Sequence, residues 1–136
     1  QLLPFADIVL AETVSSIEEV IAIQKVFADC AQPLWISMTL EDDAKASDSR
    51  LRSGELLSDA LSAINLDQVD AILFNCSQPE VMANAITLSA KRLPSNIHIG
   101  VYANGFTPIS NTIQANDGYS TLRNDLTPQA KLLHQL

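Results

Sequence analysis

Four short apolar runs divide the chain, and helical spacing of apolar residues follows them. The runs cover residues 6–11, 34–40, 69–74 and 97–102. Each run is nearly continuous rather than alternating, which is typical of strands buried on both faces. The spacing between and after the runs predicts helices at about 15–30, 55–64 and 81–92, and a last helix that begins at Thr127.

Capping residues indicate where the helices begin. Ser15 is followed three residues later by Glu18, and Ser77 is followed by Glu80, which is the spacing of a capping box. Thr127–Pro128 combines a cap residue with a proline at the first helical position. These signals predict that Ser15, Ser77 and Thr127 each cap a helix.

The order of the predicted elements is a strand–helix unit repeated four times. Strict alternation implies parallel strands joined by right-handed crossovers. The helix-to-strand returns are short, whereas two strand-to-helix loops, 41–53 and 103–126, are long and polar. This asymmetry is typical of a barrel whose working face lies at the carboxyl ends of its strands. We therefore expect an α/β protein, a partial (β/α)8 TIM barrel of about four βα units, forming one domain over residues 1–136.

Composition and charge narrow the classes of function. The 136 residues are 47% hydrophobic and carry a net charge of −8. This charge, without a basic patch, argues against a nucleic-acid partner, and no apolar run is long enough to span a bilayer. Two cysteines form no disulfide framework and no signal peptide is visible, so we expect a cytoplasmic location. Because the sequence opens with Gln1 just before a strand, we expect it to be an excerpt of a longer protein.

A cysteine stands where the third strand turns into its helix. Cys76 follows the apolar run 69–74, and the carboxyl end of a parallel strand is where α/β enzymes bind ligands. Free amides at the start of the following helix favour a thiolate at this place. The alternative is that Cys76 is a small buried hydrophobe, which is the usual role of a lone cysteine after an apolar strand.

Counting residues in twos assigns the side chains of each strand to one of two faces. The residues predicted to face the barrel interior are Ile8, Leu10, Glu12, Ile72, Phe74, Cys76, His98, Gly100, Tyr102 and Asn104. Of these, Glu12, Cys76, Tyr102 and Asn104, together with Thr39, are expected to gather at the mouth. The alternatives are a surface charge for Glu12 and a turn residue for Asn104.

Other reactive side chains are expected to be structural. Cys30 ends the first helix, and a strand of about six residues spans roughly 20 Å, so it cannot form a disulfide with Cys76. His98 begins its strand and is expected to be a structural histidine, either deep or at the lower end of the barrel, whereas His134 on the last helix is expected to be solvated. Glu41–Asp43 lacks the spacing of a calcium loop and is expected to be solvated.

Five segments occur in an order that resembles a known enzyme family. They are Leu10-Ala11-Glu12-Thr13, Trp35-Ile36-Ser37-Met38-Thr39-Leu40, Asn75-Cys76-Ser77-Gln78-Pro79-Glu80, Ile99-Gly100-Val101-Tyr102-Ala103-Asn104 and Asp125-Leu126-Thr127-Pro128. Together they resemble the middle of the homocysteine S-methyltransferases, zinc-dependent (β/α)8 barrels related to betaine–homocysteine methyltransferase and the homocysteine module of methionine synthase. The resemblance covers essentially the whole chain and implies that it corresponds to strands four to seven of eight.

The resemblance implies roles for four residues. Cys76 matches the first of three cysteine zinc ligands, Glu12 matches a glutamate that holds the amino group of homocysteine, and Asn104 matches an asparagine close to the metal. Thr39 is expected to contact the substrate. In this family the zinc-held homocysteine thiolate attacks the methyl group of a sulfonium or ammonium donor (S-methylmethionine, S-adenosylmethionine or betaine), which yields methionine.

The chain also departs from the family pattern. It lacks the Gly-Gly-Cys-Cys segment of the eighth strand and the first three strands, and Ala103 replaces a usual proline. We therefore expect these residues alone to be inactive and to bind no zinc tightly. One alternative is a non-catalytic half-barrel remnant that oligomerises without zinc through exposed strand edges at 6–13 and 97–102. Another is an unrelated barrel enzyme with Cys76 as its nucleophile.

Overall fold

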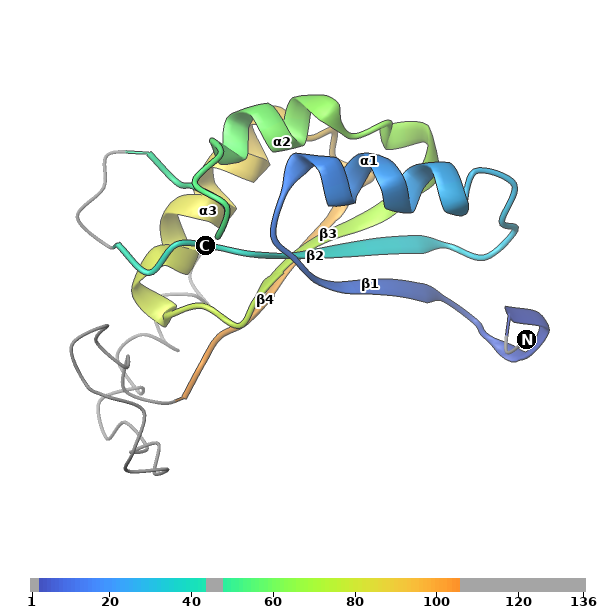
Figure 1. Cartoon of the computed structure of the whole chain (residues 1–136), viewed down its shortest axis with the longest axis horizontal. Helices are drawn as coiled ribbons and strands as arrows, with labels where there is room; N and C mark the ends of the chain where they lie inside the picture. The colour runs from blue at the N-terminus through green and yellow to red at the C-terminus, as the bar shows by residue number, and fades with distance from the viewer. Residues whose placement is uncertain (1–2, 44–47, 106–136) are drawn as a thin grey trace.

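The computed structural model of the chain describes residues 3–43 and 48–105, and the predicted last helix at Thr127–Pro128 and His134 lie outside these residues. The described elements are η1 (Leu3–Phe5), β1 (Val9–Val14), α1 (Ile17–Val26), β2 (Leu34–Thr39), α2 (Leu57–Ala63), η2 (Leu66–Gln68), β3 (Val69–Asn75), α3 (Pro79–Arg92) and β4 (His98–Tyr102) (Figure 1). All four predicted strands and the first three predicted helices are confirmed, with ends that differ by a few residues.

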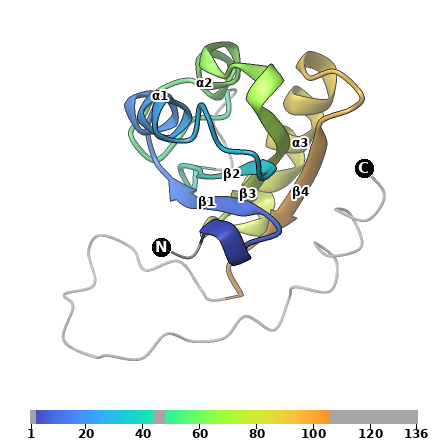
Figure 2. The same ribbon diagram turned by 90° about the vertical axis from the view of Figure 1, so that its right-hand side faces the viewer.

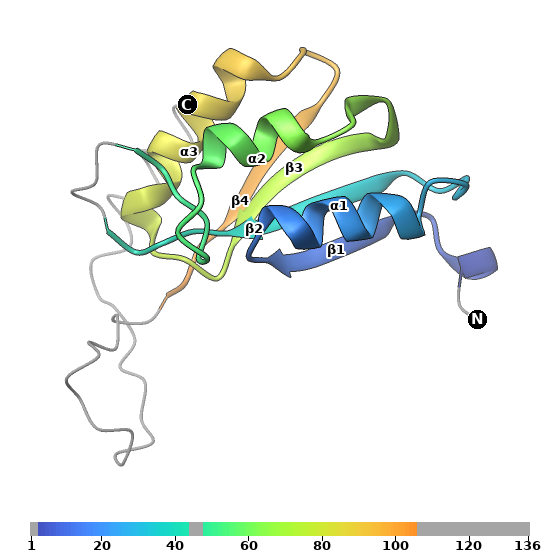
Figure 3. The same ribbon diagram turned by 45° about the horizontal axis from the view of Figure 1, so that its top comes forward.

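The four strands form one parallel sheet in the order β1-β2-β3-β4. The views in Figures 2 and 3 show α1, α2 and α3 side by side on one face of this sheet. The α/β class and the parallel pairing are thus confirmed, with β1 and β4 at the edges of the sheet as predicted. None of the helices in the described part of the chain is long and apolar enough to cross a membrane.

The hydrophobic core lies between the sheet and the helices. Ile36 of β2 pairs with Ile72 of β3, and Met38 pairs with Phe74; all four side chains are fully buried in the core cluster. The prediction that Ile72 and Phe74 face the barrel interior is therefore wrong. The prediction assumed that side chains alternate regularly up to Cys76. The backbone of Cys76 leaves the strand conformation with a φ of 50°, so Ile72 and Phe74 do not share its face.

The opposite face of the sheet is more open at its β1 edge. Ile8 and Leu10, predicted to face the barrel interior, are 40% and 42% exposed there, on the face opposite α1, α2 and α3. Further across, Gly100 of β4 pairs with Leu73 of β3, and a Cβ at Gly100 would lie 2.9 Å from the Leu73 side chain. Glycine at this position therefore lets the Leu73 side chain lie over β4.

The sheet is curved, and this open face is its concave side. Tyr102 on β4 donates a hydrogen bond of 3.0 Å to Glu12 on β1. These strands are three interstrand spacings apart, about 14 Å in a flat sheet. Because side chains stand roughly perpendicular to a sheet, two of them meet over that span only if the edge strands bend toward each other.

The caps of α1 and α3 differ from the predicted ones. The N-cap of α1 is Ser16, whose hydroxyl accepts from the amide of Glu19, and the Glu19 carboxylate returns to the amide and hydroxyl of Ser15. The capping box is thus shifted by one residue. The N-cap of α3 is Gln78, which makes no side-chain cap bond. Ser77, the predicted cap, does not cap the helix, since its buried hydroxyl bonds to the amide of Leu40, which follows β2.

Candidate functional site

Two residues with strained backbones meet at the carboxyl ends of β1 and β3. Thr13 has a φ of 62° and Cys76 a φ of 50°, and the threonine Oγ1 lies 3.8 Å from the cysteine Sγ. A positive φ is rare for any residue other than glycine and is an outlier for a β-branched one. Such strain persists where the surrounding structure enforces it, and it concentrates at functional sites.

Asn75 links these two strained residues. Its fully buried side-chain amide donates to Thr13 Oγ1 at 2.7 Å and to Cys76 Sγ at 3.2 Å. Its Oδ1 accepts from the hydroxyl of Ser37 at 2.9 Å. Asn75 and Thr13 were not among the predicted site residues. The signal for Asn75 was a polar residue at the end of an otherwise apolar strand, whereas the positive φ of Thr13 leaves no mark in the sequence.

Several polar contacts hold the turn that carries Cys76. The hydroxyl of Ser77 accepts from the amide of Leu40 at 2.7 Å, and the carbonyl of Ser77 accepts from the amide of Asn104 at 2.9 Å. Arg52 donates to the carbonyl of Cys76 at 3.1 Å and forms an ion pair with Asp42, also at 3.1 Å. These contacts connect the turn to β2, to the segment after β4 and to the β2–α2 loop.

Asp42 is an exposed loop residue that also takes part in this support. Besides its ion pair with Arg52, its carboxylate accepts from the backbone amide of Gln78 at 2.7 Å. Gln78 is the N-cap of α3, so this carboxylate provides the helix start with an acceptor from another loop. Asp42 is thus exposed, as predicted for the loop, and in addition its carboxylate has two partners in the protein.

The carboxylate and the thiol that were expected at the mouth lie on the concave side. Cys76 and Glu12 are exposed, and Glu12 accepts from the hydroxyl of Tyr102. Burial raises the pKa of Tyr102; the contact with the Ser37 hydroxyl opposes this effect, and the Glu12 carboxylate and the Cys76 sulfur reinforce it. The pKa of the Tyr102 phenol therefore depends on both Glu12 and Cys76.

The remaining predicted site residues lie beside the Cys76 turn. Thr39 is 4% exposed, with its hydroxyl 3.3 Å from that of Ser77 and 3.5 Å from the carbonyl of Cys76. Its side chain therefore supports the turn in this structure. Asn104 is half-buried and is tied to the turn by its backbone amide.

The other cysteine and the described histidine lie away from this place. Cys30 is half-buried and donates to Gln32 Oε1 at 3.1 Å, and both cysteines are free thiols. His98 begins β4 and is exposed, so it is not deep and lies instead at the amino end of its strand, the other predicted place. The reason is that β4 is an edge strand, which leaves its first residue open to solvent.

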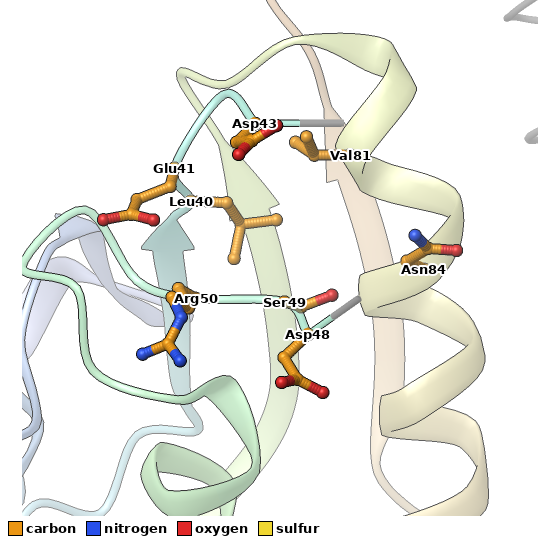
Figure 4. A pocket seen from close by; sticks show the side chains of 8 residues that line it. All are labelled: Leu40, Glu41, Asp43, Asp48, Ser49, Arg50, Val81 and Asn84. Carbon is orange, nitrogen blue, oxygen red and sulfur yellow. The ribbon is translucent and has the colours of Figure 1, made fainter. Parts of the chain in front are cut away.

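A small pocket lies between the β2–α2 loop and α3 (Figure 4). It encloses about 10 Å³, space for about one water molecule. The carboxylates of Glu41, Asp43 and Asp48 stand at separate places around it (Figure 4). Within residues 3–43 and 48–105, no group of three or more His, Cys, Asp or Glu side chains could hold a metal ion.

A comparison with protein families shows the family to which this chain is related. Residues 2–134 match the model of the family described as homocysteine S-methyltransferase. The chain belongs to this family. The homocysteine S-methyltransferase resemblance found in the five sequence segments is thus confirmed over nearly the whole length. Among curated proteins, none matches the chain significantly.

Proposed function

We propose that this chain supplies part of the active site of a zinc-dependent homocysteine S-methyltransferase that makes methionine. The observation that carries the proposal is the exposed Cys76 sulfur, fixed in a strained turn on the same concave face as the Glu12 carboxylate. Family membership supports the reaction class. The curvature of the parallel sheet supports a place for β1 to β4 as strands four to seven of an eight-stranded barrel.

Cys76 fits the role of one zinc ligand. Its sulfur is exposed at a strand end and accepts a hydrogen bond from an amide, as a thiolate ligand does. A catalytic zinc needs three protein ligands, so in this proposal two more cysteines come from outside these 136 residues. When bound, the zinc would bind the homocysteine sulfur and favour its thiolate form.

Glu12 fits the role of the group that holds the amino end of homocysteine. Its carboxylate is exposed, and Tyr102 orients it from the far edge of the sheet. A carboxylate accepts two or more N–H bonds, so it can bind an ammonium group while it keeps the Tyr102 contact. Asn104 and Thr39, beside the Cys76 turn, would border the same substrate.

The reaction in this proposal is a direct transfer of a methyl group. A lone pair of the homocysteine thiolate forms a new bond to the methyl carbon of a sulfonium or ammonium donor. The bond from that carbon to the donor atom breaks, its electron pair stays on the donor sulfur or nitrogen, and that atom becomes neutral. S-methylmethionine, S-adenosylmethionine and betaine all have such a methyl group. The two free thiols of this chain suit the reducing cytoplasm where we place the enzyme.

The test uses the protein that contains this chain, loaded with zinc and given homocysteine with each of the three donors carrying a labelled methyl group. Labelled methionine from at least one donor is expected, and it should be lost in Cys76→Ala and after chelation. Cys30→Ala is the matched control, because Cys30 lies away from the concave site. Unchanged activity in Cys76→Ala, or no labelled methionine with any donor, would overturn the proposal.

A second candidate is a non-catalytic half-barrel that associates without zinc. The observation that favours it is the row of exposed apolar side chains at the β1 edge, where Phe5 is 87% exposed and Ile8 and Leu10 about half as much. The protein that contains this chain distinguishes the two candidates. Stable oligomers without bound zinc and without methyl transfer support the remnant, whereas one zinc per active site supports the enzyme.

A further inference from the structure

We infer that Asn75 is a positioning residue that fixes the Cys76 sulfur in one orientation toward the concave face. The purpose of this orientation rests on the proposed function, in which that sulfur binds zinc. The geometry itself does not depend on it. Asn75 is the last residue of β3, and its side-chain amide lies 3.2 Å from the sulfur of the next residue.

All the hydrogen-bonding groups of the Asn75 amide are used. Its two N–H donors reach Thr13 Oγ1 and Cys76 Sγ, and its oxygen accepts from Ser37. Both N–H donors are bonded in this orientation, whereas a flipped amide would set its oxygen, an acceptor, against the Cys76 sulfur. The orientation of the Cys76 sulfur is thus determined by a chain of contacts that starts on β2.

The burial of Asn75 shows that this amide is more than a surface contact. Its side chain is fully buried, and burying an amide costs free energy unless its partners are exact in number and direction. An apolar residue would fill the same volume at the end of an apolar strand without that cost. The presence of a polar residue here is explained if the Asn75 amide stabilises the strained conformations of Thr13 and Cys76.

The contact suits a sulfur that carries negative charge. An N–H bond to a thiolate is charge-assisted and therefore stronger than one to a neutral thiol. Contacts of this kind around metal ligands typically change metal affinity about 10- to 100-fold when they are removed. Asn75 would thus pre-orient Cys76 before any metal binds.

The first test is NMR spectroscopy on the unchanged chain. The side-chain amide protons of Asn75 should exchange with solvent at least about tenfold more slowly than those of the exposed Asn84, since they are buried and bonded. Their resonances should shift in Cys76→Ala. Exchange within about threefold of Asn84, or resonances that Cys76→Ala leaves in place, would overturn the inference. No variant of Asn75 is needed, so a folding defect cannot obscure this result.

The second test asks whether Asn75 orients the sulfur. Asn75→Asp keeps the shape of the side chain but replaces both N–H donors with an acceptor. The Hα–Hβ couplings of Cys76 should then change from those of one side-chain rotamer to averaged values, while Asn84→Asp, the same change at an exposed site, should leave them unchanged. Couplings that stay at one rotamer in folded Asn75→Asp would refute the positioning role. Failure of the methyl-transfer assay alone would refute the proposed function and leave both NMR results standing.

Discussion

Replacing Ser77 with alanine should lower the free energy of unfolding by about 2 kcal/mol. The Ser77 hydroxyl is fully buried, accepts from the amide of Leu40 at 2.7 Å and lies 2.9 Å from the carbonyl of Asn75. Alanine would leave the Leu40 amide buried without this partner, and an unsatisfied buried donor costs about 1–3 kcal/mol. For a domain of this size the loss corresponds to about 8 °C in melting temperature.

The same substitution at Ser89 should have the opposite sign. Ser89 is also fully buried, but among the described residues its hydroxyl is the one buried side-chain polar atom without a hydrogen-bond partner. Removing an unpaired hydroxyl from the interior relieves a desolvation cost of about 1 kcal/mol. Alanine is also a better helix former than serine by a few tenths of a kcal/mol. We expect Ser89→Ala to stabilise the chain by about 1 kcal/mol.

Urea unfolding of the purified chain, followed by the fluorescence of its single tryptophan, Trp35 on β2, measures both effects. The two variants should differ by about 3 kcal/mol at an unchanged denaturant slope, which shows that native stability has changed. Ser62→Ala, at an exposed serine of α2, is the control and should stay within about 0.5 kcal/mol of the wild type. Equal stabilities of Ser77→Ala and Ser89→Ala would refute the hydrogen-bond reasoning, because it assigns them opposite signs.

Four further predictions concern backbone strain, pH, zinc and association. Gly54→Ala should cost about 1–2 kcal/mol in urea unfolding, because Gly54 has a φ of +92°; an unchanged midpoint would contradict this. Hydrogen bonds from the Ser53 hydroxyl and the Ile17 amide hold the pKa of Glu55 below its ordinary value of 4.5. Its contribution to stability is therefore present above that value and is lost as the pH falls through the folded-state pKa. Glu55→Gln should flatten the acid side of the stability–pH curve. Parallel curves for Glu55→Gln and the wild type would contradict this prediction. Elemental analysis of the chain after mild chelation should find far less than one zinc per chain, since Cys76 is a single thiolate ligand; one retained zinc would show the ligand count wrong. Light scattering at micromolar concentration should detect association through the β1 and β4 edges, and a stable monomer that unfolds cooperatively would refute the edge argument.

Hydrophobic patterning predicted the framework of this molecule well. The four apolar runs became β1 to β4 because parallel strands covered by helices need continuous apolar side chains, and their order along the chain gave the parallel pairing. The exposed Ile8 and Leu10 also follow from the pattern, because α1, α2 and α3 all pack on the other face of the sheet (Figures 2 and 3). Local signals were sufficient for this part, since each depends on residues close together in the sequence.

Capping signals were less reliable, because tertiary contacts compete for the same side chains. Ser77 and Glu80 have the spacing of a capping box, yet Ser77 bonds to Leu40 of the neighbouring strand end. The acceptor for the start of α3 comes from Asp42, which is 36 residues away from Gln78 in the sequence. No local rule predicts such a pairing, because it requires the sheet to bring two loops together.

The candidate site lies where strand geometry ends, which explains why counting residues in twos misplaced its surroundings. In a regular strand, successive side chains point to opposite faces. The positive φ of Cys76 breaks this alternation, so that Asn75 and Cys76 turn to the same side and bond to each other. The same happens on β1, where Glu12 reaches Tyr102 and its neighbour Thr13 reaches Asn75. Two breaks of alternation thus bring a carboxylate, a hydroxyl, an amide and a thiol to one edge of the sheet, where regular strands would place only half of them. The backbone strain is therefore the structural origin of the site, and it is the feature that the sequence pattern does not encode.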